Sequence, residues 1–318
     1  MSEERDLRLA VLIDADNAPR SALGDVMAEV AVYGTPTIKR IYGDWTTPNL
    51  ASWKPLLLEN AITPVQQYGY TTGKNSTDSA MIIDAMDILY SGRVDGFVLV
   101  SSDSDFTRLA TRLREAGMKV YGMGERKTPG PFIVACDKFV YIEVIRAAGD
   151  RARAAAKEAA RQAAEEEKAE QARLERERKE REKAEQARAS ESARTESGKS
   201  TSRRGKKKAE PAKPVEPEPK PAPVPASAEG SEPANRIPPE VEALLADSVE
   251  DIADEDGYAF MGDLGNLLVK KQPDFDPRNF GFSKLTKLVK AMDRFEIDVR
   301  STNLPHVKHI FVRDKEPK

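Results

Sequence analysis

The chain has 318 residues and a formal net charge of −3 at pH 7, with 32% of its residues charged. Its one cysteine, Cys136, excludes an intrachain disulfide, and no apolar run is long enough to span a bilayer, so we expect a cytoplasmic protein without a membrane partner. The two histidines, His306 and His309, lie near the end of the chain, which disfavours classical zinc sites and Ser-His-Asp or Cys-His catalysis in the first domain.

Strand-like and helix-like patterns alternate over residues 1–150. Apolar runs predict strands at Leu9–Ile13, Thr37–Tyr42, Ile62–Gln66, Phe97–Val100, Lys119–Met123 and Phe139–Ile142. Helical spacing of apolar residues predicts helices near residues 19–33, 49–60, 77–90, 106–116 and 132–136. Strands that alternate with helices favour an α/β domain with three layers and a parallel sheet.

The composition changes at residue 151. Residues 151–190 consist almost entirely of Ala, Glu, Arg, Lys and Gln, and Leu174 is their one large apolar residue, which predicts a solvated charged helix and disfavours a coiled coil. The remainder of the linker, to residue 236, is rich in Ser and Pro and is expected to be disordered. The basic run at residues 203–208 is either a solvated tail or a contact for nucleic-acid phosphates.

Residues 237–318 return to a globular pattern. Apolar periodicity predicts helices over residues 237–253 and around residues 264–268, and Asp276-Pro277 is a typical start for a third helix that extends to Met292. Two alternating segments, Phe295–Val299 and Val307–Val312, predict a hairpin. We therefore expect a small winged-helix-like α+β domain.

Aspartates follow two of the predicted strands and begin two of the predicted helices. Asp14 ends the first strand, Asp103 follows the strand at residues 97–100, Asp105 precedes the next helix, and Asp78 begins the helix at residues 77–90. The carboxyl ends of parallel strands meet at one edge of a sheet, so these side chains should converge if the two strands are neighbours. Singly, each of them also suits a helix cap or a turn.

A cluster of aspartates favours the binding of a cation. Neighbouring carboxylates repel one another, and a divalent metal relieves that repulsion. Carboxylate oxygens favour a hard ion such as Mg²⁺ or Mn²⁺. Farther along the same helix, Asp84 is a candidate for supporting the ligands, whereas Asp87 is expected to face solvent.

Three blocks of the first domain resemble the LabA-like NYN domains of the PIN-like nuclease superfamily. They are Ile13-Asp14-Ala15-Asp16-Asn17, Lys74-Asn75-Ser76-Thr77-Asp78 with Asp84, and Ser101-Ser102-Asp103-Ser104-Asp105-Phe106. The resemblance implies a PIN-like fold and cleavage of RNA that depends on Mg²⁺ or Mn²⁺. It assigns the catalytic and metal-binding roles to Asp14, Asp78, Asp103 and Asp105, with Asn17 as a further metal ligand and with Asp16 and Asp84 as additional acidic positions.

The last domain resembles the LOTUS (OST-HTH) modules in its Gly257–Leu268 segment, Phe275-Asp276-Pro277, Phe280-Gly281 and Leu285–Leu288. This resemblance implies RNA, or an RNA-processing protein, as a partner. Candidate substrate contacts are Lys74, Ser102, Lys284, Lys287 and Lys290. Each of these lysines also suits a solvated surface. The sequence does not specify an oligomeric state.

Two other functions compete with a ribonuclease. The first is a non-catalytic RNA-binding or scaffold protein of RNA metabolism. The second is a HAD-type phosphatase, in which Asp14 would be the nucleophile and Asp16 the general acid. That family favours Thr or Val at the position of Ala18 and a later lysine near paired acids, and neither is evident here.

Overall fold

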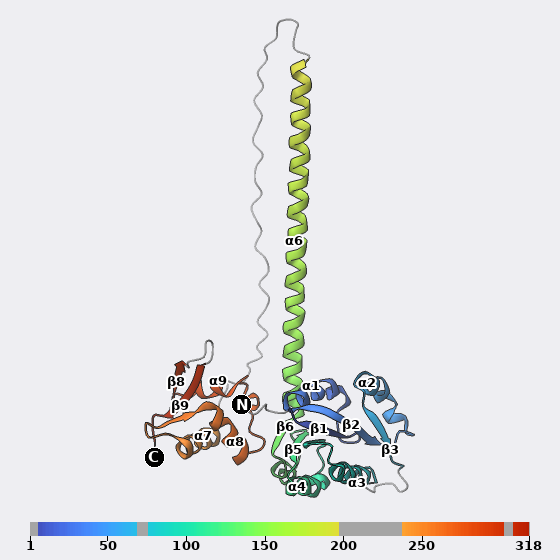
Figure 1. Ribbon diagram of the computed structural model, residues 1–318, viewed down its shortest axis with the longest axis vertical. Coiled ribbons are helices and arrows are strands. Elements are labelled where there is room, and N and C mark those ends of the chain that lie inside the picture. Colours follow the sequence, from blue (N-terminus) through green and yellow to red (C-terminus); the bar gives the residue numbers. More distant parts are fainter. Residues whose placement is uncertain (1–5, 69–75, 197–236, 302–307, 318) are drawn as a thin grey trace, which may run out of the picture. The chain divides into compact units, whose positions relative to one another are not determined.

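A computed structural model of the protein describes residues 6–68, 76–196, 237–301 and 308–317 (Figure 1). Three parts follow one another along the chain: an α/β domain, a long charged helix and a small α+β module. The α/β domain and the α+β module belong to one compact unit, and the middle segment forms a second unit. The predicted fold classes are confirmed.

The α/β domain is built on a six-stranded parallel sheet. Its strands are β1 (Arg8–Asp14), β2 (Thr35–Gly43), β3 (Thr63–Gln66), β4 (Gly96–Val100), β5 (Lys119–Gly124) and β6 (Lys138–Tyr141), in the order β3-β2-β1-β4-β5-β6. The first strand therefore lies beside the fourth, and Ile13 is in register with Val100. The strand order reverses between β1 and β4, which is where open α/β sheets bind their ligands.

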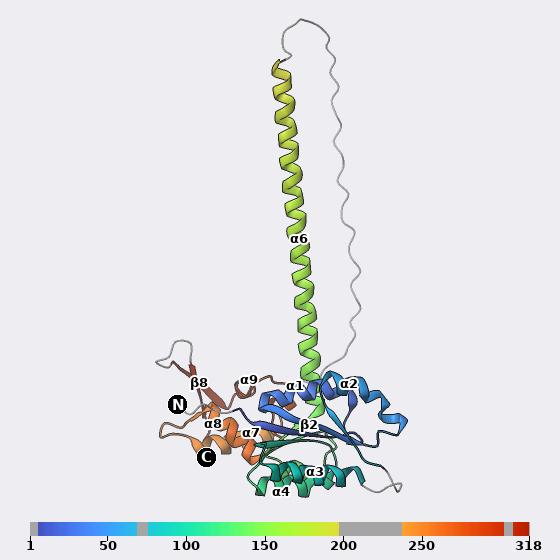
Figure 2. The same cartoon turned by 45° about the vertical axis from the view of Figure 1, so that its right-hand side comes forward.

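Helices cover both faces of this sheet (Figure 2). The helices α1 (Leu23–Tyr33) and α2 (Lys54–Glu59) pack on one face, and α3 (Ser76–Ser91), α4 (Thr107–Glu115) and α5 (Gly130–Ala135) pack on the other. Alternate residues of β1 enter the two cores: Leu9, Val11 and Ile13 face α1, whereas Ala10 and Leu12 face α3. The domain has the three layers that the alternating pattern predicts.

Some helices and strands begin or end at residues other than those predicted, and prolines and helix starts explain these differences. The helix predicted over residues 49–60 divides into a 3-10 turn (Pro48–Trp53) and α2, because Pro55 lacks the N–H that a helix interior requires and suits a first turn. Similarly, a 3-10 turn (Arg20–Ala22) precedes α1. The last strand ends at Tyr141, since Ile142 already begins the next helix.

That helix, α6 (Ile142–Glu196), contains 55 residues and begins before the predicted position at residue 151. At 1.5 Å per residue it is about 80 Å long. Its first residues Ile142, Val144 and Ile145 are buried, whereas Leu174 is exposed. Ion pairs such as Lys179–Glu175 connect successive turns, as expected for a solvated charged helix. The basic run at residues 203–208 lies outside the described residues.

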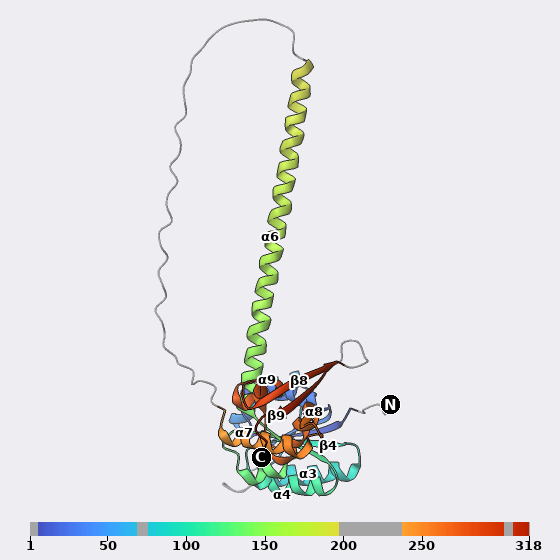
Figure 3. The ribbon, with the colours of Figure 1, turned by 90° about the vertical axis from the view of Figure 1, so that its left-hand side faces the viewer.

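The α+β module contains α7 (Pro239–Ile252), β7 (Tyr258–Phe260), α8 (Met261–Lys271), a 3-10 turn (Pro277–Phe280), α9 (Leu285–Lys290), β8 (Phe295–Ser301) and β9 (Lys308–Asp314) (Figure 3). Its sheet has the order β7-β9-β8, so the predicted hairpin is confirmed and the sequence analysis missed β7. The prediction of a continuous third helix was wrong. Gly281 adopts a left-handed conformation (φ 83°) that ends the 3-10 turn, and α9 starts afresh at Leu285.

Among the described helices, none combines the length and apolar character needed to cross a membrane.

Candidate metal centre

Asp14 is the last residue of β1 and lies at the carboxyl end of the sheet. Its side chain is completely buried. The main-chain N–H groups of Asp16 and Asn17 donate to Oδ1 at 3.0 and 3.3 Å, and the side-chain amide of Asn17 donates to Oδ2 at 2.9 Å. These bonds hold the chain in a tight turn immediately after the strand.

Ser101 connects Asp14 to the end of β4. Its hydroxyl donates to Oδ2 of Asp14 at 2.8 Å and accepts the main-chain N–H of Asp103 at 3.1 Å. Ser101 is fully buried, so the two hydrogen bonds fix the loop that carries Asp103 relative to the end of β1. The pairing of β1 with β4 makes this bridge between residues 87 positions apart possible.

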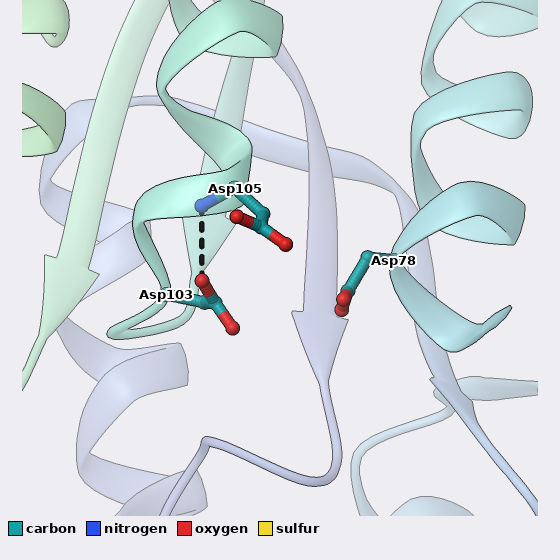
Figure 4. Close-up of side chains that lie close together, drawn as sticks. All are labelled: Asp78, Asp103 and Asp105. Carbon is teal, nitrogen blue, oxygen red and sulfur yellow. Dashed lines mark hydrogen bonds between the residues drawn. The ribbon is translucent and has the colours of Figure 1, made fainter. Parts of the chain in front are cut away.

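Asp103 and Asp105 flank the short 3-10 turn that precedes α4. Asp103 occupies the N-cap position, and its Oδ1 accepts the main-chain N–H of Asp105 at 2.9 Å. The predicted capping role and a ligand role are therefore compatible, because one carboxylate oxygen caps the turn while the other lies on the side that faces Asp78 (Figure 4).

Asp78 approaches these two residues from the first turn of α3 (Figure 4). Desolvation, together with the negative charges of Asp14, Asp103 and Asp105, raises the pKa of Asp78 to about 6. A charge pair separated by about 5 Å interacts by about 1 kcal/mol in water and by about 3 kcal/mol near a protein surface. The repulsion that the sequence predicts is thus present in the folded protein.

The geometry of the three carboxylates fits a hard cation. Asp78, Asp103 and Asp105 each offer one oxygen, and these oxygens lie within 4.8 Å of one another. Mg²⁺ binds oxygen at about 2.1 Å, so two oxygens on opposite sides of one ion are separated by about 4.2 Å. The separations of the three oxygens have an upper limit close to that distance. An oxygen-only donor set matches Mg²⁺ or Mn²⁺ better than zinc.

Comparisons with known protein families identify one domain in each of the two globular parts of the chain. The NYN domain profile matches residues 8–143, and the OST-HTH/LOTUS domain profile matches residues 235–307. The chain carries an NYN domain followed by an OST-HTH domain. The PIN-like fold expected from the sequence is confirmed. No curated protein matches the chain.

Two solved structures resemble parts of the chain. A protein of unknown function from Vibrio parahaemolyticus is 22% identical, with a TM-score of 0.38, over 45% of this chain and 96% of that protein. An uncharacterized protein from Nitrosomonas europaea is 32% identical, with a TM-score of 0.25, over 30% of this chain and 91% of that protein.

Of the other predicted acidic positions, Asp16 lies near the three carboxylates, whereas Asp84 and Asp87 have other surroundings. Asp16 is exposed; desolvation and the charge of Asp14 raise its pKa, although a hydrogen bond to Thr77 opposes the shift. Asp84 accepts hydrogen bonds from Arg40 and from the Tyr42 hydroxyl, so its partners lie on β2. Asp87 is exposed, as expected.

The predicted substrate contacts are also dispersed. Lys74 lies outside the described residues. Ser102 is almost buried, and its hydroxyl accepts the main-chain N–H of Glu125 at 2.9 Å, so it ties the end of β4 to the loop after β5. In the OST-HTH domain, Lys284, Lys287 and Lys290 are exposed, and Lys284 is the N-cap of α9 rather than part of the helix.

Ser101 is the residue of the site that the sequence analysis left without a role. The pair Ser101-Ser102 was visible between the strand and the aspartates, but the pattern alone does not tell which serine faces the neighbouring strand. The pairing of the strands decides it, since Ile13 lies opposite Val100 and the hydroxyl of the next residue, Ser101, donates to Asp14.

Proposed function

We propose that this protein is a metal-dependent ribonuclease whose NYN domain hydrolyses RNA phosphodiester bonds at Asp78, Asp103 and Asp105. The observation that carries the proposal is the convergence of these three carboxylates at the switch point of a parallel sheet. The NYN domain supports a nuclease-type fold, and the OST-HTH domain supports RNA as the substrate.

The residues of the chain have distinct tasks in this proposal. Asp78, Asp103 and Asp105 hold Mg²⁺ or Mn²⁺, which neutralises charge on the scissile phosphate and favours ionisation of a water near neutral pH. Asp103 is kept in one orientation by the N–H of Asp105, so its other oxygen stays on the side that faces Asp78. This preorganisation lowers the cost of assembling the site when RNA arrives.

Asp14 and Asn17, the other two predicted ligands, have a supporting task in the arrangement described. Four hydrogen bonds saturate the two oxygens of Asp14, and binding a metal directly would break the bond from Ser101 or the one from the Asn17 side chain. The same saturation argues against a HAD-type phosphatase, because a nucleophile needs an accessible carboxylate oxygen and Asp14 is completely buried.

The OST-HTH domain supplies positive charge for RNA. Lys287 and Lys290 lie one turn apart on α9, and Lys284 lies immediately before it. All three are exposed, so they are free to contact phosphates without sequence preference. Replacing Lys287 and Lys290 with alanine should weaken RNA binding and reduce its salt dependence, whereas Lys157→Ala on α6 should not.

A cleavage assay tests the proposal. The wild-type protein should cleave RNA with Mg²⁺ or Mn²⁺ and lose this activity with a chelator. Asp103→Asn should lower the rate by about 10²–10³-fold, the usual cost of losing one electrostatic contact to the reacting groups. Asp87→Asn is the matched control, since it removes one exposed carboxylate from α3.

Equal cleavage by the wild type and Asp103→Asn would reject the carboxylate site. RNA binding without any metal-dependent cleavage would favour the non-catalytic RNA-binding or scaffold protein. The two outcomes are separated by measuring binding and cleavage on the same RNA.

A further inference from the structure

The proposed nuclease chemistry makes no use of Glu29, a nearly buried carboxylate of the NYN domain. It lies in the second half of α1, on the sheet face opposite α3, and is only 9% exposed. The hydroxyl of Tyr33, one turn later, donates to its Oε1 at 2.7 Å. A carboxylate this deeply buried requires a cation, and here the cation comes from the OST-HTH domain.

Arg278 is that cation. Its Nη1 and Nη2 donate to the two carboxylate oxygens of Glu29 at 2.8 and 2.7 Å, which is the bidentate arrangement that arginine favours. The other edge of the guanidinium donates to Asp276 through Nε at 2.9 Å and through Nη2 at 2.7 Å. Asp276 is 6% exposed, so Asp276 fixes the orientation in which Arg278 meets Glu29.

A second set of contacts lies at β6, the edge strand of the parallel sheet. The main-chain N–H of Phe139 donates to the carbonyl of Pro273 at 2.9 Å, and the Tyr141 hydroxyl donates to Oδ2 of Asp274 at 2.7 Å. An edge strand otherwise presents its N–H groups to solvent. Residues 273–278 therefore complement both the hydrogen-bonding edge of β6 and the buried negative charge of Glu29.

We propose that the OST-HTH domain docks onto the NYN domain of its own chain through residues 273–278, which we call the latch segment. The occupant is the chain's own module, because the linker keeps it at a high effective concentration. Charge complementarity supports this assignment, since Arg278 lies between one carboxylate from each domain. The two domains then behave as one body that handles RNA, in place of two modules on a free tether.

The latch segment contacts elements other than those that carry the three aspartates. The latch segment meets β6 and the second half of α1, whereas the three aspartates belong to the loop after β4 and to the start of α3. These elements lie on different faces and strands of the sheet. The proposed docking contacts therefore do not use the elements that carry the proposed metal ligands.

Amide hydrogen exchange of the full chain tests the proposal, and its outcome does not depend on nuclease activity. Exchange at Phe139 reports docking directly, because its N–H donates to Pro273. Arg278→Ala should accelerate this exchange at least tenfold. The amide of Val120, which donates to Asp137 inside the NYN domain, should keep its rate and serves as the internal control.

Arg294→Ala is the matched control variant. Arg294 makes a similar bidentate pair with Asp314, but within the OST-HTH domain, so its loss should leave Phe139 protected. If Arg278→Ala disturbs the module itself, exchange in the β8–β9 ladder will also rise. Glu29→Gln then replaces it, since this change lies in the NYN domain and should accelerate Phe139 alone.

Unchanged Phe139 exchange in both Arg278→Ala and Glu29→Gln would overturn the proposal. Protection of Phe139 should also be independent of protein concentration. Protection that rises with concentration would assign the contact to a second copy of the chain and would overturn docking in cis.

Discussion

Buried carboxylates at two sites of the chain have opposite electrostatic environments. At the latch, Glu29 and Asp276 share the guanidinium of Arg278, and hydrogen bonds from Arg278 and Tyr33 outweigh desolvation and keep the pKa of Glu29 below its ordinary value. At the metal centre, the charges acting most strongly on Asp78 are other carboxylates, and desolvation together with these charges raises its pKa to about 6.

The difference is between a carboxylate that faces a cation and a carboxylate that faces other carboxylates. A carboxylate with a fixed cation contributes a defined contact between elements, and its charge is satisfied without any added ion. A carboxylate among carboxylates costs stability until a cation binds, and proteins retain such costs at functional sites. The opposite directions of the two pKa shifts follow from the groups that each carboxylate faces, which are a guanidinium for Glu29 and other carboxylates for Asp78.

Metal addition should have the largest effect. Mn²⁺ at about a hundred times its dissociation constant should stabilise the wild-type protein by about 2.7 kcal/mol, because it binds the folded state. The Asp78→Asn, Asp103→Asn double variant should lose this gain while staying folded. The melting temperature with and without Mn²⁺ measures it, and Glu29→Gln should respond like the wild type. An undiminished response in the double variant would place the ion elsewhere.

Breaking the latch should have the next largest effect. A double-mutant cycle of Glu29→Ala and Arg278→Ala should give a coupling energy of about 1–2 kcal/mol, within the range for residues in direct contact. Undocking lets both charges regain water, which keeps the value below that of a pair buried in a single core. Denaturant unfolding of the four proteins measures it. A coupling energy near zero would contradict a stable contact between Glu29 and Arg278.

Removing one charge from the metal centre should stabilise the metal-free protein. Asp78→Asn should raise the free energy of unfolding at pH 7 by about 1 kcal/mol. At this pH Asp78 is ionised although its surroundings raise its pKa to about 6, so its charge lowers the stability of the folded protein. Solvent screens part of this destabilisation. Thermal unfolding in chelator measures the change. The same substitution at Asp87 should have no effect, and a loss of stability in Asp78→Asn would show that its charge is compensated.

The smallest effect concerns pH. The pKa of Glu29 is lowered, so its contribution to stability is full above its ordinary value of 4.5 and is lost as the pH falls through the lower folded value. Arg278 and Lys138, which act on Glu29 from the OST-HTH domain and from β6, stay protonated in this window, and Asp276 lies on the other side of Arg278. The difference in melting temperature between wild type and Glu29→Gln should be constant from about pH 7 to 5 and shrink below about pH 4.5. A difference that grows on acidification would reverse the sign we assign.

Local patterns predicted most of the fold. The run from Leu9 to Ile13 is apolar on both faces, which is typical of a strand covered by helices on each side, and it is indeed buried throughout. The division of the third OST-HTH helix into two pieces was missed because Gly281 can end a turn or continue one. Its left-handed conformation is chosen by the packing around it.

The sequence by itself determined the kinds of elements and the two domain families, because these follow from periodicity and from motifs contained in short segments. Tertiary structure decided which acids meet. Asp14 and Asp103 could not be related until β1 was paired with β4. That pairing made Ser101 the bridge and gave Asp14 the one of its four hydrogen bonds that comes from outside its own turn. The contact of Glu29 with Arg278 spans 249 positions, so no local pattern specifies it. It exists because the fold brings Arg278 of the OST-HTH domain to a nearly buried carboxylate of α1.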